Sequence, residues 1–479
     1  MKNKYKKFTL ILFLIQTYFS LIYCSNYISM KLHNYNNELI KEIPDNLFSY
    51  EHFINITIKN LIFTSINIGN PNQVVKTWID SDEFSYFIYK DICILDSYYN
   101  EKISSSFESN DNKTFFYNGY GEAIYINETL ILNTDINENN GKIELKKYPI
   151  MFMKDPKNDI RFNYLHSIDD ITNKTCATIG LKYMYDNNEK NAKNFINILK
   201  EKEIIDDYSI FIEYDKNHNE EYLIIGGYPE EIYNKKYNIK HQHTTYIKFY
   251  YEYINQWGLY FDKISSGEEG KIYQVDAALH YNLGVIYGVQ EYQSYIERNY
   301  FNYYMNLNIC EKQQYKDYTF FMCNKDKFTI EEMVKFPELK FIKADLDEIF
   351  TLTYEDLFFI KGDKIYFLIV FHRILKKVWE LGKPFLKKYT FAFNFDSKLI
   401  WYYKKINYDE EDNKENKNID DKSYINDNII FIIIIIALSI VLGIISFILG
   451  RIIFSRKKKK IKAEELDQDF NYENIDNGN

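Results

Sequence analysis

The sequence predicts a mostly β globular region followed by one membrane-spanning helix. The chain has 479 residues, enough for about three folding units or one large two-lobed unit. Between about residues 60 and 405, short runs alternate apolar with polar side chains, as in Phe63–Ile68, Tyr222–Ile225 and Phe391–Phe395. A period of two, rich in β-branched and aromatic residues, is typical of strands. Helical patterns are few and short, and the clearest covers Asn191–Ile205.

The first residues are typical of a secretory signal peptide. Lysines at positions 2, 4, 6 and 7 precede a short apolar run at about Phe8–Tyr23, and small residues follow at Cys24–Ser25. We therefore assign residues 1–24 to a signal peptide. An uncleaved signal anchor is the alternative, although the apolar run is short for a membrane span.

A second apolar run, residues 429–450, contains no charged side chain. As a helix it would extend about 33 Å, which is enough to cross a bilayer core. Arg451 and the basic run Arg456–Lys460 follow it, and basic residues tend to stay on the cytoplasmic side. The sequence therefore predicts a single-pass type I membrane protein of the secretory pathway. Residues 408–428 would form a polar stalk before the span, and residues 451–479 a cytoplasmic tail.

Composition excludes several classes of function. A net charge of −9 argues against a protein that grips nucleic-acid backbones. The chain has only 17 Gly and 7 Pro, which excludes collagen, flexible linkers and Pro-rich scaffolds. No P-loop, dinucleotide-binding or zinc-protease motif occurs, so we expect no cofactor. His241 and His243 share one face of a predicted strand, but the other histidines are scattered, so we expect no metal site.

The cysteines and glycosylation motifs fit an oxidising lumen. If Cys24 leaves with the signal peptide, four of the five cysteines remain. Four cysteines allow three pairings; our interpretation joins Cys310 to Cys323 across a short loop, and Cys93 to Cys176. Four Asn-x-Thr sequences are acceptors for N-glycosylation, at Asn55, Asn112, Asn127 and Asn173.

Residues 63–80 contain a motif in addition to the alternation that predicts strands. After the run at Phe63–Ile68, a turn contains Gly69, Pro71 and Gln73, and a second apolar run ends at Asp80. This arrangement resembles the opening of pepsin-like aspartic proteases, which have a strand, an I-G-x-P-x-Q turn, a second strand and then the catalytic D-T-G. The resemblance implies that Asp80 is the first catalytic aspartate.

Further stretches follow the order of the same family. Tyr120 and Gly121 resemble the flap hairpin that covers the substrate cleft, and Thr178–Leu181 resembles the turn that supports the first catalytic loop. Asp276 sits where the second D-T-G belongs. Leu381–Asp396 resembles the closing L-G-x-x-F-L signature. The resemblance implies that Asp276 is the second catalytic aspartate.

The resemblance covers about residues 61–405. It implies a bilobal pepsin-like aspartic protease fold, with two six-stranded-type β lobes around a central cleft that takes a peptide or protein substrate or ligand. Residues 60–230 would form the N-terminal lobe and residues 231–407 the C-terminal lobe. Residues 25–59 occupy the place of a propeptide, and either a short propeptide or an extra first strand fits this segment.

The chemistry of such a site needs two carboxylates that share one proton. The ionised carboxylate acts as a base toward water, and the protonated one donates to the scissile carbonyl. The first motif departs from D-T-G, because Ser81 keeps a hydroxyl but Asp82 replaces the glycine. Asp82 adds a Cβ and a further carboxylate beside the candidate dyad.

The second motif departs further. Ala277 lacks the hydroxyl of the family threonine, and Ala278 replaces the glycine. Groups that orient a catalytic side chain are worth orders of magnitude in rate. Two functions therefore stay open: a membrane-anchored aspartic endopeptidase with a divergent site, and a catalytically inactive relative that binds a partner at the cell surface or in the lumen.

Overall fold

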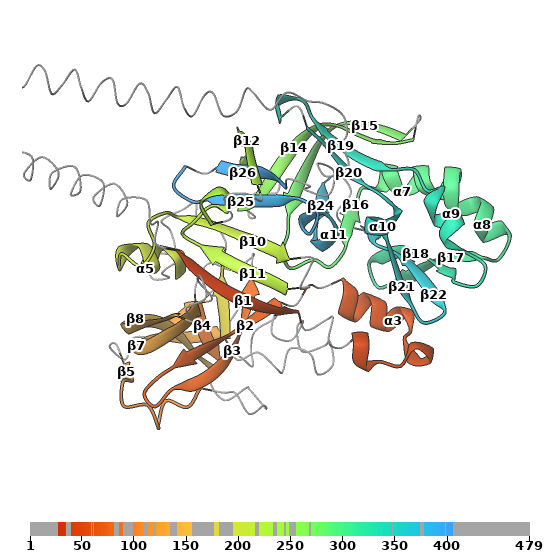
Figure 1. The fold of residues 1–479 in the computed structure, drawn as a ribbon. Helices are drawn as coiled ribbons and strands as arrows, with labels where there is room; N and C mark the ends of the chain where they lie inside the picture. The colour runs from red at the N-terminus through yellow and green to blue at the C-terminus, as the bar shows by residue number, and fades with distance from the viewer. Residues whose placement is uncertain are drawn as a thin grey trace, which may run out of the picture. The chain divides into compact units, whose positions relative to one another are not determined.

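The computed structural model of the protein describes part of the chain, and the architecture below refers to that part. The described residues are 27–34, 40–58, 60, 62–80, 86–89, 99–109, 114–117, 121–134, 141–155, 177–181, 195–215, 220–232, 237–243, 246–248, 255–267, 270–346, 348–373, 378–397 and 399–405. The structure is mostly β, as predicted, and its strands form two sheets (Figure 1).

The first sheet has fourteen described strands. Their order is β12-β26-β25-β10-β11-β1-β2-β3-β9-β4-β8-β7-β5, and β6 pairs with β7. The strand bounds are β1 Ile28–Asn34, β2 Ile62–Ile68, β3 Gln73–Asp80, β4 Tyr86–Tyr89, β5 Glu108–Ser109, β6 Phe115–Tyr117, β7 Gly121–Thr134, β8 Gly141–Asp155, β9 Ala177–Gly180, β10 Ser209–Asp215, β11 Glu220–Ile225, β12 Tyr237–His243, β25 Thr390–Asn394 and β26 Leu399–Lys405. The three runs predicted to be strands fall in β2, β11 and β25, with Phe395 just beyond the end of its strand.

The second sheet has twelve described strands. Their order is β20-β19-β14-β15-β24-β16-β23-β18-β22-β21, with β13 beside β14 and β17 beside β18. The strand bounds are β13 Tyr246–Lys248, β14 Asn255–Ser266, β15 Gly270–Leu279, β16 Ile286–Gly288, β17 Cys310–Tyr315, β18 Tyr318–Asn324, β19 Leu339–Lys343, β20 Glu348–Leu352, β21 Phe358–Lys361, β22 Lys364–Phe367, β23 Ile369–His372 and β24 Trp379–Leu381. The predicted disulfide between Cys310 and Cys323 is present and closes the β17–β18 hairpin, in which the two residues are directly paired.

The two halves of the chain repeat one strand arrangement. In the first half, β2 pairs antiparallel with β3, β3 parallel with β9, β9 antiparallel with β4, and β4 parallel with β8. In the second half, β14, β15, β24, β16 and β23 repeat these pairings with the same directions. The strands also follow one another along the chain in the same order. Paired positions in these five strands of one half therefore have counterparts in the other half.

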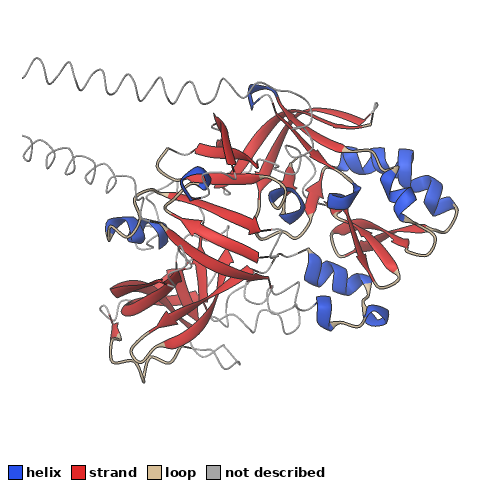
Figure 2. Cartoon of the chain, in the orientation of Figure 1, coloured by secondary structure: helices blue, strands red, loops and turns tan. Residues whose placement is uncertain are grey.

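The helices are short and lie mostly in the second half (Figure 2). Their bounds are η1 Asp45–Leu47, α3 Tyr50–His52, η2 Phe53–Thr57, α5 Phe195–Glu201, α6 Pro229–Ile232, α7 Gln290–Ile296, η5 Glu297–Phe301, α8 Asn302–Asn306, α9 Ile330–Val334, η6 Ala344–Leu346, α10 Tyr354–Leu357 and α11 Lys383–Leu386. Within the predicted helix at Asn191–Ile205, α5 ends at Glu201. Glu203 has a φ of 57°, so the backbone turns into the left-handed region and the helix cannot continue.

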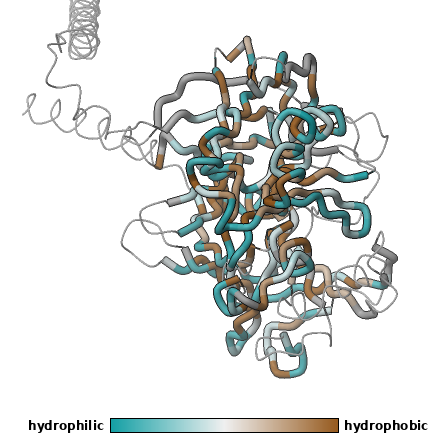
Figure 3. The backbone as a smooth tube through the Cα atoms, turned by 90° about the vertical axis from the view of Figure 1, so that its right-hand side faces the viewer, coloured by the Kyte–Doolittle hydropathy of each residue, from teal (hydrophilic) through white to brown (hydrophobic). Residues whose placement is uncertain are grey.

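The N-terminal segment is built into the core. Residues 28–34 form β1, so the extra first strand is present, and it pairs with β11 and β2. Phe48, Phe53 and Ile58 then join an apolar cluster with second-half residues. The ring of Phe53 stacks on that of Tyr366, with 4.5 Å between centroids. In Figure 3 hydrophobic stretches of the backbone gather in the interior, and several outer loops are hydrophilic.

The predicted membrane topology lies beyond the described region. The signal peptide at residues 1–24, the stalk at residues 408–428, the span at residues 429–450 and the tail at residues 451–479 are all outside the described residues. Among the residues that the structure describes, no helix has the length and apolar character that a membrane crossing requires.

Candidate functional site

Asp80 is the last residue of β3 and is buried, with 7% of its surface exposed. It lies opposite Gly180 in the parallel β3–β9 pair, and its carbonyl oxygen accepts a hydrogen bond from the amide of Leu181 (2.7 Å). The turn at Thr178–Leu181, which the family resemblance predicts to support the first catalytic loop, therefore contacts Asp80 directly.

The repeated arrangement identifies the residue that corresponds to Asp80 in the second half. In β15–β24, Ala278 pairs with Glu380 and Leu279 with Leu381, so one step further His280 lies opposite Gly382. The amide of His280 donates to the carbonyl of Leu381 (3.0 Å). Asp80 and Gly180 occupy the same places in β3–β9.

The neighbouring antiparallel strand pair in each half gives the same correspondence between Asp80 and His280. Tyr86 pairs with Ile179 in β4–β9, and Ile286 pairs with Leu381 in β16–β24. Tyr86 follows Asp80 by as many positions as Ile286 follows His280. The two halves thus align through this region without an insertion, and His280 is the counterpart of Asp80.

The carboxylate of Asp80 contacts the loop that follows His280. Asn282 donates from Nδ2 to Oδ1 of Asp80, at 2.7 Å. A carboxamide in this position is a hydrogen-bond donor that carries no charge. The counterpart of Asn282 in the first half is Asp82, which lies outside the described residues.

Asn60 holds the same loop from the N-terminal side. Its backbone amide donates to the carbonyl of Asn282, and its Nδ2 donates to the carbonyl of Tyr281, both at 2.7 Å. Its Oδ1 accepts from Asn34 of β1 at 2.6 Å. Asn60 is 1% exposed. A row of amide side chains therefore connects β1 to the loop that touches Asp80.

His280 faces a carboxylate of its own. It is 5% exposed, and its Nε2 lies 3.7 Å from Oε2 of Glu380 on the adjacent strand β24. When protonated, the imidazole would form a buried ion pair with Glu380. The second half thus supplies an imidazole with an acidic neighbour where the first half supplies Asp80.

Asp276 lies in a different environment. It pairs with Tyr260 in β14–β15 and is exposed, and it precedes His280 by four positions, so its counterpart in the first half is Lys76. Desolvation raises the pKa of Asp276, and no neighbouring charge contributes among the described residues. A carboxylate beside Asp80 would instead have its pKa raised by repulsion between like charges.

Some of the other predicted site residues lie in described strands or helices, and the rest lie outside the described residues. Ala277 and Ala278 are fully buried in β15. Gly121 begins β7 and pairs with Tyr117 in the β6–β7 hairpin, which matches the predicted flap hairpin in position along the chain. Ser81, Tyr120, Cys93, Cys176, Asn112 and Asn173 lie outside the described residues, whereas Asn55 lies in η2 and Asn127 lies half-buried in β7.

Metal chemistry finds no support in the described part of the chain. No group of three His, Cys, Asp or Glu side chains comes together there as a metal ion would require.

No protein-family model and no curated protein matches the sequence.

The contact between Asn282 and Asp80 predicts a pH-dependent variant. Asn282→Asp would place two carboxylates within hydrogen-bond distance, which raises the folded-state pKa of the pair above the unfolded value of about 3.9. The variant should therefore match the wild type near pH 4. It should then lose about 2 kcal/mol of unfolding free energy as the pH rises through the raised pKa toward 7. Urea unfolding between pH 4 and pH 8 measures this difference.

Asn282→Ala is the control, because it removes the donor and adds no charge. It should cost roughly 1–3 kcal/mol, and this cost should vary much less with pH. If Asn282→Asp and Asn282→Ala showed the same dependence on pH, the direct contact with Asp80 would be contradicted.

Proposed function

We propose that the protein is a pepsin-like aspartic peptidase homologue that has lost peptide hydrolysis and acts as a binding or interaction protein. The observation that carries this proposal is the strand register, in which His280 is the counterpart of Asp80. The bilobal pepsin-like fold is supported by the repeated arrangement of five strands in each half. It is also supported by the six neighbouring strands β12-β26-β25-β10-β11-β1, which draw on both halves.

The chemical reason is the missing shared proton. In an aspartate dyad, one carboxyl must remain protonated beside the other, and repulsion between the two carboxylates is what raises its pKa. The described contact of Asp80 is with the neutral amide of Asn282, which stabilises an ionised carboxylate without offering an acidic proton. A carboxamide in the place of a second carboxyl cannot supply the proton that a dyad donates to the scissile carbonyl.

The proposed location is the luminal or extracellular side of a secretory-pathway membrane. The apolar run at residues 429–450 and the basic run after it support a type I anchor. The disulfide between Cys310 and Cys323 supports an oxidising compartment, since such bonds are rare in the cytosol. A peptide or protein ligand in the cleft between the lobes remains the proposed partner.

The test is cleavage of a mixed peptide library by the full-length protein in detergent across pH 3–7, followed by mass spectrometry. We expect the wild type to cleave no more than Asp80→Asn at any pH. Cleavage that Asp80→Asn abolishes would contradict the proposal and restore the endopeptidase alternative. Asp276→Asn and His280→Ala would then show which residue supplies the second catalytic group.

A further inference from the structure

A cavity of about 560 Å³ lies between the N-terminal segment and the second half of the chain. Its volume is in the range that holds small organic ligands. Glu355 and Asp356 of α10 line it, and we call them the acidic wall. Lys383 of α11 lines it together with Lys387 and Lys388 just after that helix, and these three form the basic wall.

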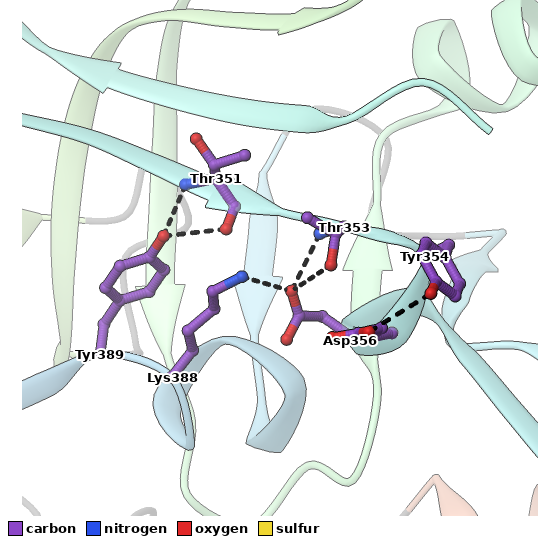
Figure 4. Close-up of polar contacts among 7 residues, drawn as sticks. Thr351, Thr353, Tyr354, Asp356, Lys388 and Tyr389 are labelled. Carbon is purple, nitrogen blue, oxygen red and sulfur yellow. Dashed lines mark hydrogen bonds and ion pairs between the residues drawn. The ribbon is translucent and has the colours of Figure 1, made fainter. Parts of the chain in front are cut away.

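The two walls meet at one ion pair, shown in Figure 4. Lys388 reaches from its segment to Asp356, with 2.6 Å between Nζ and Oδ2. The same Oδ2 accepts bonds from the backbone amide (2.9 Å) and the hydroxyl (3.3 Å) of Thr353. Tyr389 fixes the basic segment to the sheet, because its hydroxyl accepts from the amide of Thr351 and donates to the carbonyl of the same residue.

Both walls keep capacity for a ligand. The three bonds of Asp356 converge on Oδ2, so Oδ1 can accept further bonds. Lys388 uses one of its three ammonium donors on Asp356. Glu355 is exposed, and its carboxylate accepts the hydroxyl of Tyr354 at 3.3 Å. Lys383 already pairs with Glu221, with 2.8 Å between Nζ and Oε1, and Lys388 pairs with Asp356. A ligand that brings one charge of each sign keeps this balance of charge, whereas an ion of one sign would disturb it.

The rest of the lining is apolar or polar without charge. Ile40, Phe359 and Leu368 give the cavity a hydrophobic side, and Asn60 gives it a polar one. Thr57 also lines it, and its hydroxyl is buried with no hydrogen-bond partner in the described part of the chain. Buried polar groups normally have partners. The lining therefore suits a molecule that combines charged ends with an apolar side chain.

We propose that this cavity binds a small zwitterion with an apolar side chain, a free amino acid or a dipeptide. The ligand carboxylate meets the basic wall, and the ligand ammonium meets the acidic wall. Pairing both charges of the ligand avoids the large cost of enclosing an unpaired one. The proposal is independent of whether Asp80 takes part in hydrolysis.

The cavity is also connected to the candidate functional site. Asn60 lines it and bonds to the backbone of Tyr281 and Asn282, and Asn282 donates to Asp80. Gly284 of the same loop also lines it, and its amide donates to the carbonyl of Ile58 (2.8 Å). A bound zwitterion would therefore lie against the loop that positions the partner of Asp80.

Calorimetric titration of the full-length protein in detergent at pH 7 tests the proposal. Leucine and leucyl-leucine carry both charges, N-acetyl-leucine carries the negative charge alone, and leucine amide carries the positive charge alone. We expect leucine or leucyl-leucine to bind at least about tenfold more tightly than either singly charged compound. The tighter of the two identifies the source as a free amino acid or a peptide. Equal binding of N-acetyl-leucine or leucine amide, or no binding by any compound, would overturn the proposal.

Single substitutions locate the binding. Glu355→Gln and Lys387→Gln change exposed side chains of opposite walls, so the fold should be retained, and each should weaken zwitterion binding about tenfold. Glu331→Gln is the matched control, since Glu331 is exposed in the first turn of the short helix α9 as Glu355 is in α10. Unchanged binding in both wall variants would place the ligand elsewhere and refute the assignment.

Discussion

Gly382→Ala is expected to lower the free energy of unfolding by about 3 kcal/mol or more, because no space exists for a methyl group there. A Cβ on Gly382 would overlap the carbonyl oxygens of Val285 and Leu283. These atoms belong to backbone, and the carbonyl of Leu283 already accepts the amide of Lys383 at 2.7 Å. The strain would therefore reach the loop that begins at His280. Urea unfolding followed by circular dichroism measures the loss.

Gly227→Ala is the matched control. A Cβ at Gly227 would meet Cδ1 at the far end of the Ile232 side chain and Cβ of Tyr27, both at 3.0 Å, and it would meet no backbone atom among its three nearest neighbours. We expect a cost of about 1 kcal/mol or less. If Gly382→Ala were as mild as Gly227→Ala, the close packing of Gly382 against the backbone of Leu283 and Val285 would be contradicted.

Phe53→Ala is expected to destabilise the fold by about 3–5 kcal/mol, the range for removing a buried aromatic ring. Phe53 is fully buried, and its ring contacts Tyr366 and Phe320 of the second half, at centroid distances of 4.5 Å and 5.4 Å. Such packing makes the segment at residues 40–58 part of the same apolar cluster as these second-half residues. Thermal and urea unfolding of the full-length protein measure the change.

Leu47→Ala is the control within the same segment, because Leu47 is 60% exposed. Its cost should be within about 0.5 kcal/mol. A removable propeptide would make a different prediction: Phe53→Ala would leave the unfolding of the rest of the chain unchanged. The two variants together therefore decide whether residues 40–58 can be lost without loss of the fold.

Local patterning predicted the strands well and the helices poorly. The alternation in Phe63–Ile68 predicts one buried face, and β2 has it. In β11, by contrast, Leu223, Ile224 and Ile225 are all buried, so both faces of that strand are covered. The helices α7, η5 and α8, from Gln290 to Asn306, were not predicted. Their buried residues include Tyr292 and Ile296, four positions apart, and Phe301 and Tyr304, three apart. Aromatic residues occur throughout this chain, so this spacing does not stand out in the sequence.

In the candidate site, the sequence identifies Asp80 but not the residues that surround it. Asp80 was found because a turn motif precedes it at a fixed distance. In the second half the prediction of Asp276 depends on its lying where the second D-T-G belongs in the order of the family. Strand register is a property of pairing between distant segments, so only the structure could identify His280 as the counterpart. Asn60 and Asn282 carry no sequence signal, since asparagine is common in this chain.

The six neighbouring strands described above also determine how the molecule comes apart. In that part of the sheet β10 of the first half pairs with β25 of the second, through Ser209–Asn394, Ile210–Phe393 and Phe211–Ala392. Phe211 and Ile224 share an apolar cluster with Tyr403 on the far side of that seam. Neither half can bury these side chains alone. Although the two halves share one strand arrangement, we therefore expect them to unfold together. Loss of structure in one half would remove the packing that stabilises the other, so both should unfold in a single transition.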